Sequence, residues 1–150
     1  VIGGEGEHEG FDDIQAAIFG CKRARLEERV EDLRQAALLL DEALAEHSIR
    51  LTSEALNGRH VFRAYTILLD ERDRVREFLA ARGVSTRVYY NPPLHLQPAF
   101  RHLGYRFGAF PAAERTAERM LSLPIYPTMS TRQVDRVAAA LADCQQPQKT

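Results

Sequence analysis

The chain has 150 residues, 45% of them hydrophobic, which suffices for one domain with a buried core. Its 20 basic and 21 acidic residues give a formal net charge of −1, so we expect neither nucleic acid nor a membrane as a partner. No apolar run approaches the roughly 18 residues that span a bilayer, and Cys21 and Cys144 form no metal or disulfide pattern. We therefore expect a cytoplasmic protein with free thiols and no metal site.

The first ten residues, VIGGEGEHEG, combine four glycines with a histidine and several glutamates. Such a composition buries little apolar surface, so we predict that residues 1–10 form a flexible segment. One domain is expected to follow over residues 11–150.

Two amphipathic helices are predicted in the first third of the chain. The first begins at an acidic cap, Asp12 or Asp13, and the second runs from Leu26 to about Glu46. The apolar stripe of the first helix comprises Ile14, Ala17, Ile18 and Cys21. The core-facing seam of the second helix comprises Leu26, Val30, Leu33, Ala37, Leu40 and Leu44. A short strand is expected over residues 48–53.

A strand, a helix and a second strand are predicted next. The first strand runs from about His60 to Leu69, and the helix is capped by Asp70 and stopped by Gly83. The second strand is VSTRVYY, residues 84–90. With helices on either side, this order predicts an α/β fold of the two-layer α+β type, in which helices pack on a small sheet.

Two more helices are expected towards the C-terminus. Pro111 opens one that reaches Leu123. Its inward residues are expected to be Ala113, Ala117, Met120 and Leu121. Ser130 and Gln133 form the capping-box signature of the last helix. Its buried face is expected to hold Val134, Val137 and Leu141.

The loop YYNPPLHLQPAF, residues 89–100, is the most distinctive local pattern. Pro92, Pro93 and Pro98 fix their own φ near −65° and disfavour helix in the residue before them. We therefore expect an extended and ordered loop. No nucleophile elbow, zinc-protease motif or phosphate-binding glycine loop occurs elsewhere in the sequence.

Three stretches, in this order, resemble the C-terminal part of DegT/DnrJ/StrS-type sugar aminotransferases. They are DDIQAAI, YYNPPLHLQ, and the run from FPAAER to LSLPIYP. The resemblance extends from about Val1 or Phe11 to Leu141, and the combination of three stretches makes it specific. It implies the small C-terminal domain of a fold type I enzyme that uses pyridoxal phosphate, usually as a homodimer. Such enzymes move an amino group from an amino-acid donor to a keto-sugar nucleotide.

The resemblance also implies site residues. Tyr90, His95 and Gln97 then lie on the substrate side of the active site, where they contact an amino-acid carboxylate or a sugar hydroxyl. The alternative is a structural role, in which His95 hydrogen-bonds its own loop while Tyr89 and Tyr90 pack on opposite faces of the sheet.

The groups that hold the cofactor in this family are not recognisable in the sequence. The resemblance assigns the Schiff-base lysine, the acid at the pyridine nitrogen and the phosphate cradle to a large N-terminal domain. Only Lys22 and Lys149 occur here, and both have the pattern of surface residues. The family's Asn-x-Arg before DDIQAAI is also missing: VIGG matches the segment before it, or GGEG is the remnant of a glycine-rich turn. We expect this chain alone not to bind pyridoxal phosphate.

These observations leave two main hypotheses. The chain is the small domain of a sugar aminotransferase, inactive by itself, or it is a non-catalytic binding or assembly module. Such a module would pair with itself or with an intact aminotransferase subunit. The seam from Leu26 to Leu44 favours the module, because an amphipathic helix without its partner layer exposes a large apolar patch. A third hypothesis makes the chain itself a transaminase that uses Lys22.

Overall fold

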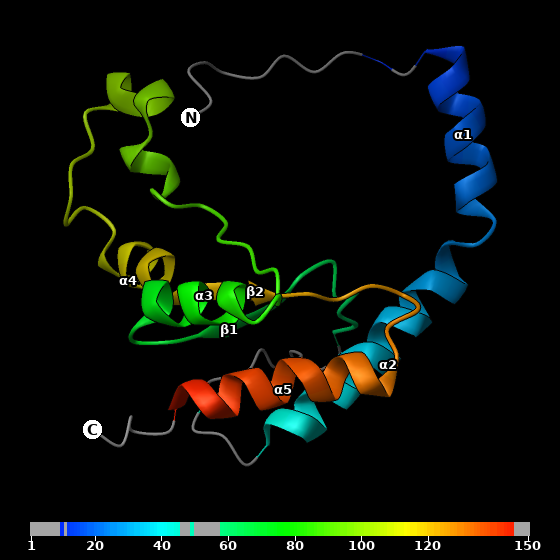
Figure 1. The fold of residues 1–150 in the computed structure, drawn as a ribbon. Helices are drawn as coiled ribbons and strands as arrows, with labels where there is room; N and C mark the ends of the chain where they lie inside the picture. Colours follow the sequence, from blue (N-terminus) through cyan, green and yellow to red (C-terminus); the bar gives the residue numbers. More distant parts are fainter. Residues whose placement is uncertain (1–9, 11, 46–48, 50–57, 146–150) are drawn as a thin grey trace.

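The structure is a computed structural model that describes residues 10, 12–45, 49 and 58–145. Its elements are, in chain order, α1 (Asp13–Arg23), α2 (Leu26–Leu44), β1 (Tyr65–Leu68), α3 (Arg72–Ala81), the 3₁₀ turns η1 (Leu94–Leu96) and η2 (Pro98–Leu103), α4 (Pro111–Arg119), β2 (Met120–Leu123) and α5 (Thr131–Gln145). Figure 1 shows α2 and α5 on one side of a small sheet. The predicted two-layer arrangement of helices and sheet is confirmed.

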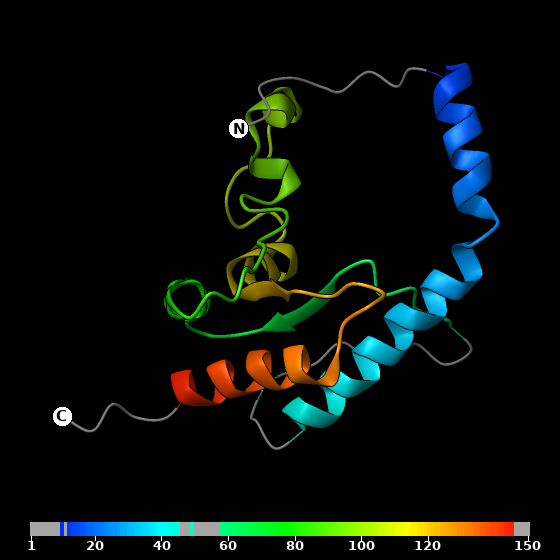
Figure 2. The same ribbon diagram turned by 45° about the vertical axis from the view of Figure 1, so that its right-hand side comes forward.

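Two arms project from the other side of the sheet. One is α1, and the other is the segment of residues 89–110 with its two 3₁₀ turns; Figure 2 shows the same arrangement after rotation. The sheet face between these arms is the one that α2 and α5 leave uncovered.

The sheet is built on β2. β1 pairs with it in antiparallel register, with Thr66 opposite Ser122, and the two hydroxyl oxygens lie 2.7 Å apart. At the other edge of β2, Arg87 forms an antiparallel bridge with Ser122 through backbone hydrogen bonds of 3.0 and 2.8 Å. The strand predicted over residues 84–90 is thus reduced to this one bridge.

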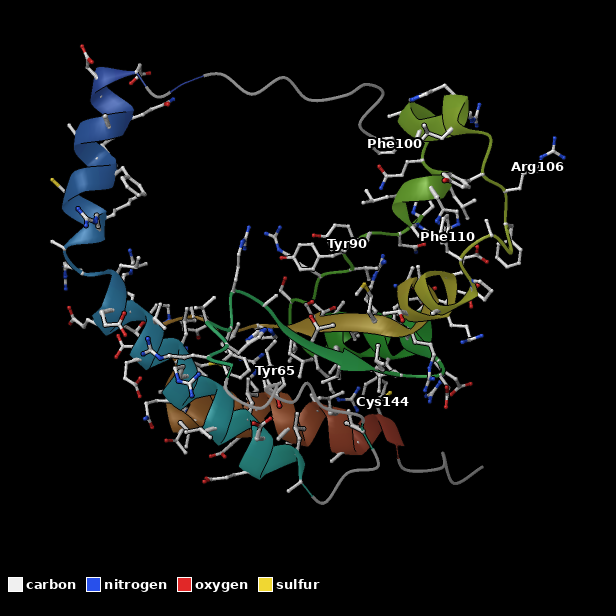
Figure 3. The ribbon with its side chains drawn as sticks, turned by 180° about the vertical axis from the view of Figure 1, so that it is seen from behind. Tyr65, Tyr90, Phe100, Arg106, Phe110 and Cys144 are labelled. Carbon is white, nitrogen blue, oxygen red and sulfur yellow. The ribbon has the colours of Figure 1, made fainter. Side chains whose placement is uncertain are left out.

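The core lies between the sheet and the helices α2, α3 and α5. Its fully buried large side chains are Leu40, Leu44, Tyr65, Ile67, Leu79, Leu121, Val134 and Leu141. Tyr65 points from the sheet towards the helices (Figure 3), and its hydroxyl donates to the Asp41 carboxylate. Burial of each such side chain contributes about 1.5–3 kcal/mol to stability.

The seam of α2 is covered rather than exposed. Four of its predicted residues are buried, namely Val30, Ala37, Leu40 and Leu44, whereas Leu33 is half-buried and Leu26 is exposed. α5 and the sheet form the partner layer of this helix. The prediction that the seam is exposed is therefore wrong, and it no longer favours a binding module.

The apolar stripe of α1, in contrast to the seam of α2, is not buried. Asp12 caps α1 as predicted, since its carboxylate accepts from the backbone N–H of Gln15 at 2.7 Å. Its apolar stripe is exposed, however, and α1 contributes no buried residue. Ile14 is 74% exposed and Ile18 is 49% exposed, so this stripe is an apolar surface that the described fold leaves open.

The predicted helix from Pro111 to Leu123 is wrong beyond Arg119. Met120 has extended backbone dihedrals, φ −71° and ψ 134°, and β2 begins there. β1 supplies backbone partners for these residues, and this pairing overrides the helical periodicity of their side chains. Ala117 and Leu121 are buried as expected, Met120 is half-buried, and Ala113 is exposed.

The strand and helix before that segment also differ in their bounds. The strand begins at Tyr65 rather than His60, and α3 begins after Glu71, which makes no side-chain cap. Asp70 forms an ion pair with Arg119 at 2.8 Å instead of capping the helix. Gly83 does end the helix, as predicted, with a left-handed φ of +71°.

The last helix agrees with its predicted cap and buried face. Gln133 Oε1 accepts from the backbone N–H of Ser130 at 2.9 Å, and Val134, Val137 and Leu141 are buried. The predictions for residues 1–9, for all of residues 48–53 except Ile49, and for Lys149 lie outside the described residues. Within the described part, no helix has the length and apolar character needed to span a membrane.

Candidate functional site

The proline-rich loop is ordered but not extended. Its residues form the turns η1 and η2, because a proline φ near −65° also suits the first residue of a 3₁₀ turn. Gln97 ties the loop together by donating from Nε2 to the carbonyl oxygen of Pro92 at 3.2 Å. The Asn91–Pro92 peptide bond is cis, and Tyr90 before it has a φ of +56°.

A buried carboxylate holds this loop against α4. Glu114 Oε1 lies 2.9 Å from His95 Nε2, and their side chains are 6% and 9% exposed. Both oxygens of Glu114 also accept from the backbone N–H of Gly108 at 2.9 Å, and Oε1 accepts from that of Phe110 at 3.2 Å. The His95 ring meets the Phe110 ring edge-on, with centroids 4.9 Å apart.

The environment of Glu114 favours its ionised form. Desolvation raises the pKa of this carboxyl, but the hydrogen bonds from Gly108, Phe110 and His95 together lower it below its usual range. An ionised carboxylate only accepts hydrogen bonds, so His95 carries its proton on Nε2 in this contact. The pair fixes both the orientation and the tautomer of the imidazole.

An apolar cleft of about 580 Å³ opens beside the loop. Its lining consists of Tyr90, Pro93, Leu94, His95, Ala112, Ala113, Thr116, Ala117 and Met120. Tyr90 is 64% exposed and is well placed to offer its hydroxyl to a ligand, whereas the Thr116 hydroxyl donates to the carbonyl oxygen of Ala112 at 2.9 Å. Figure 3 shows Tyr90 at the base of the arm that also carries Phe100 and Phe110.

The structure separates the three residues singled out in the sequence. Tyr90 and His95 line the same cleft, but Gln97 does not, and its amide is used within the loop. His95 forms its hydrogen bond with Glu114 of α4. The structural role considered for His95 in the sequence, a hydrogen bond within its own loop, was therefore right about a hydrogen bond and wrong about its partner. Sequence reasoning missed Glu114, whose signal was an acidic residue in the first turn of a helix opened by proline.

A larger cleft, of about 730 Å³, lies where α1 meets α2 and the segment before α5. Its charged lining residues are Lys22, Arg25, Glu28, Arg29 and Asp32. Lys22 is exposed and belongs to a helix without buried residues. Across the residues that the structure describes, no three His, Cys, Asp or Glu side chains are grouped to hold a metal ion.

Comparison with known proteins gives concordant results. Residues 6–142 match the model of the DegT/DnrJ/EryC1/StrS aminotransferase family. A pleiotropic regulatory protein of Geobacillus stearothermophilus is 39% identical over 92% of this chain, and a UDP-N-acetyl-3-dehydro-alpha-D-glucosamine 3-aminotransferase of Acidithiobacillus ferrooxidans is 33% identical over 91%. The crystal structure of S. venezuelae DesV with a ketimine intermediate superposes with a TM-score of 0.86 at 31% identity, over 94% of this chain. The chain spans only 36–40% of the length of these proteins.

Proposed function

Because the family match covers most of its length, the chain belongs to the DegT/DnrJ/EryC1/StrS aminotransferase family, and we propose that it serves the transfer of an amino group to a keto-sugar nucleotide. The observation that carries this proposal is the match of both sequence and fold over more than nine-tenths of the chain. The similar enzyme of Acidithiobacillus acts, by its name, on a UDP-linked amino sugar.

Pyridoxal phosphate, which the family implies, does not fit the described residues. A Schiff-base lysine must become a free amine, which burial or a cationic neighbour promotes. Lys22 lies exposed on α1, a helix without buried residues, so no buried pocket surrounds its amine. No step through the cofactor follows from these side chains, and the hypothesis that Lys22 carries it has no support in the geometry.

In our proposal this segment is the small domain and contributes to the substrate side of the site. Tyr90 contacts the substrate directly, because its side chain is exposed at a cleft and its backbone is held in the left-handed region. His95 is the next candidate, although its Nε2 is bound to Glu114, and Gln97 orders the loop that presents both.

The proposal includes a homodimer located in the cytoplasm. The exposed stripe of α1, with Ile14 and Ile18, supports a contact with further protein, from the same polypeptide or from a second subunit. The free thiols Cys21 and Cys144 support a reducing compartment.

The experiment begins with the native polypeptide that contains this sequence. Its intact mass is measured, and its N-terminus is mapped by peptide mass spectrometry. The protein is then loaded with pyridoxal phosphate and incubated with L-glutamate and a UDP-linked 3-keto sugar. We expect formation of 2-oxoglutarate together with a sugar product whose mass shows that an amine has replaced the ketone.

Residues 1–150 expressed alone provide the control and are expected to form neither product. A native polypeptide that takes up the cofactor but consumes no glutamate with any keto-sugar nucleotide would overturn the proposal. Activity of residues 1–150 alone would overturn the assignment of this segment as a non-catalytic small domain.

A further inference from the structure

We propose that the open face of the sheet carries a binding site for a small oxyanion, a carboxylate or a phosphate, held by Arg63 and Arg87. Both side chains line a cleft of about 210 Å³. This volume is roughly seven times the 30 Å³ that a water molecule occupies in the liquid, which is room for one anionic group and its immediate substituents.

The backbone dictates that Arg87 faces this cleft. Residues 84–89 alternate between two faces, as extended chains do: Val84 is buried and Val88 packs on the core, whereas Ser85, Arg87 and Tyr89 line the cleft. The bridge between Arg87 and Ser122 anchors this register on β2. Because Ser122 also lines the cleft, the sheet itself forms the floor.

Arg63, the second arginine, lies at the other edge of the sheet. Arg63 and Ala64 lie in the bend just before β1, and Pro124, Ile125 and Tyr126 follow β2. The cleft is therefore assembled from three chain segments. Figures 1 and 2 show these segments meeting at the small sheet.

The charge of this cleft is not compensated by the described protein groups. The described lining residues include two arginines and neither aspartate nor glutamate. Other arginines form ion pairs with carboxylates, as Arg119 does with Asp70 at 2.8 Å. In the part of the chain that the structure describes, Arg63 and Arg87 form no such ion pair. Two guanidinium groups that line one small cleft repel each other, and an anion bound between them attracts both.

The chemistry of the lining fits a planar or tetrahedral oxyanion. Each guanidinium presents paired N–H donors that match two oxygens of a carboxylate or phosphate. Tyr89 and Tyr126 also line this cleft, and a tyrosine hydroxyl can donate a further hydrogen bond to an anion. The Ser122 hydroxyl, whose residue is only 5% exposed, is already engaged with Thr66 and completes the floor.

This pocket adjoins the cleft of the proline-rich loop, since Tyr89 lines the first and Tyr90 lines the second. Two sources of the oxyanion are consistent with the proposed function: the carboxylate of an amino-acid donor and a phosphate of a sugar nucleotide. The choice between these sources rests on the proposed function, whereas anion binding itself does not.

The test measures binding to the native polypeptide by isothermal titration calorimetry in a buffer free of phosphate and carboxylate. The probes are L-glutamate, UDP and inorganic phosphate, and the variants are Arg63→Gln and Arg87→Gln. We expect each variant to weaken binding of at least one probe tenfold or more. Arg101→Gln is the matched control, because Arg101 is exposed and absent from this lining. It is expected to leave all affinities unchanged.

The affinities of the variants for the three probes distinguish the two sources of the oxyanion. A loss confined to L-glutamate identifies the donor carboxylate, and a loss confined to UDP and phosphate identifies the nucleotide. Unchanged affinities in both variants, or no binding of any probe to the wild type, would overturn the proposal. Arginine-dependent binding without amino transfer would refute the proposed function alone, and amino transfer with unchanged affinities would refute this site alone. Both arginines are exposed, so unfolding midpoints equal to that of the wild type serve as the folding check.

Discussion

His95 donates from Nε2 to Glu114 Oε1 across 2.9 Å, and this contact joins the proline-rich loop to the start of α4. The same carboxylate accepts from the backbone of Gly108 and Phe110. One buried acidic residue thus connects two segments of the arm to the helix that follows it. His95 lines the same cleft as the exposed Tyr90, which we propose to contact substrate, so this anchor orders one wall of that cleft.

Glu114→Gln is expected to loosen the arm. The amide has one acceptor oxygen and presents N–H donors to Gly108, Phe110 or His95, which are donors themselves. We expect a thermal unfolding midpoint several degrees below that of the wild type and faster proteolysis within residues 89–110. Glu118→Gln, an exposed site on the same helix, is the control and is expected to change neither measurement. Equal effects of the two variants would contradict the anchoring role.

The contribution of Glu114 depends on pH in a definite direction. Its pKa is lowered in the folded state, so its stabilisation is present above the unfolded carboxyl pKa of about 4.3 and is lost as the pH falls through the folded value. The difference in unfolding free energy between the wild type and Glu114→Gln is therefore expected to shrink from pH 7 to pH 3. Urea unfolding at a series of pH values measures this difference. A difference that grows in acid would refute the assigned sign.

Leu40→Ala tests the packing of α2 against α5. Leu40 is fully buried, so removal of its branched side chain is expected to cost about 2–5 kcal/mol in unfolding free energy. Leu38→Ala on the same helix is the control, because Leu38 is 53% exposed, and its expected cost is below about 1 kcal/mol. Both values come from urea denaturation. Similar costs would mean that α2 does not pack through the seam described here.

Tyr65→Phe removes the hydroxyl that donates to Asp41. The expected loss is about 1.5–3 kcal/mol, the range for a hydrogen bond to a charged group. Burial, the hydrogen bond to Asp41 and the charge of Asp41 all raise the pKa of this phenol far above its usual value of 10.0. Its stabilising effect is thus present below pH 10 and is lost as the pH rises towards the folded pKa.

The alkaline limb of unfolding checks this second property. In the wild type, stability is expected to fall above pH 10 more steeply than in Tyr65→Phe, as followed by circular dichroism in urea. Identical alkaline limbs would show that Tyr65 ionises as freely in the folded protein as in the unfolded one.

Tyr90→Asn separates function from stability. The left-handed backbone of Tyr90, with φ +56°, suits asparagine better than tyrosine, and the exposed ring contributes little packing. We expect the unfolding free energy to stay within about 0.5 kcal/mol of the wild type. In the native polypeptide, we expect KM for the sugar nucleotide to rise about tenfold or more. An unchanged KM and kcat would remove Tyr90 from the substrate side.

Sequence patterns predicted most of the helical framework. The Asp12 cap, the Gly83 stop and the Ser130–Gln133 contact follow from local hydrogen bonding and backbone preference, which need only neighbouring residues. Periodicity likewise located the buried faces of α2 and α5, because these faces lie within single helices.

The errors arose where distant segments meet. Met120 and its neighbours continue a helical pattern, but β1 offers them backbone partners, and they become a strand. The position of Asp70 in the sequence predicts a helix cap, but its carboxylate forms an ion pair with Arg119 and does not cap α3. Likewise, a single sequence predicts no partner for His95 other than its own loop.

The sequence by itself determined the family, most of the helices and the identity of the proline-rich loop, since motifs and local propensities depend on neighbouring residues. The tertiary structure decided which side chains share a site: Glu114 with His95 at the arm, and Arg63 with Arg87 at the end of the sheet. These groups lie far apart in sequence, and only the pairing of β1, β2 and the segment at Arg87 brings the two arginines to one cleft. Burial and uncompensated charge depend on that packing, so they emerge only once the chain has folded.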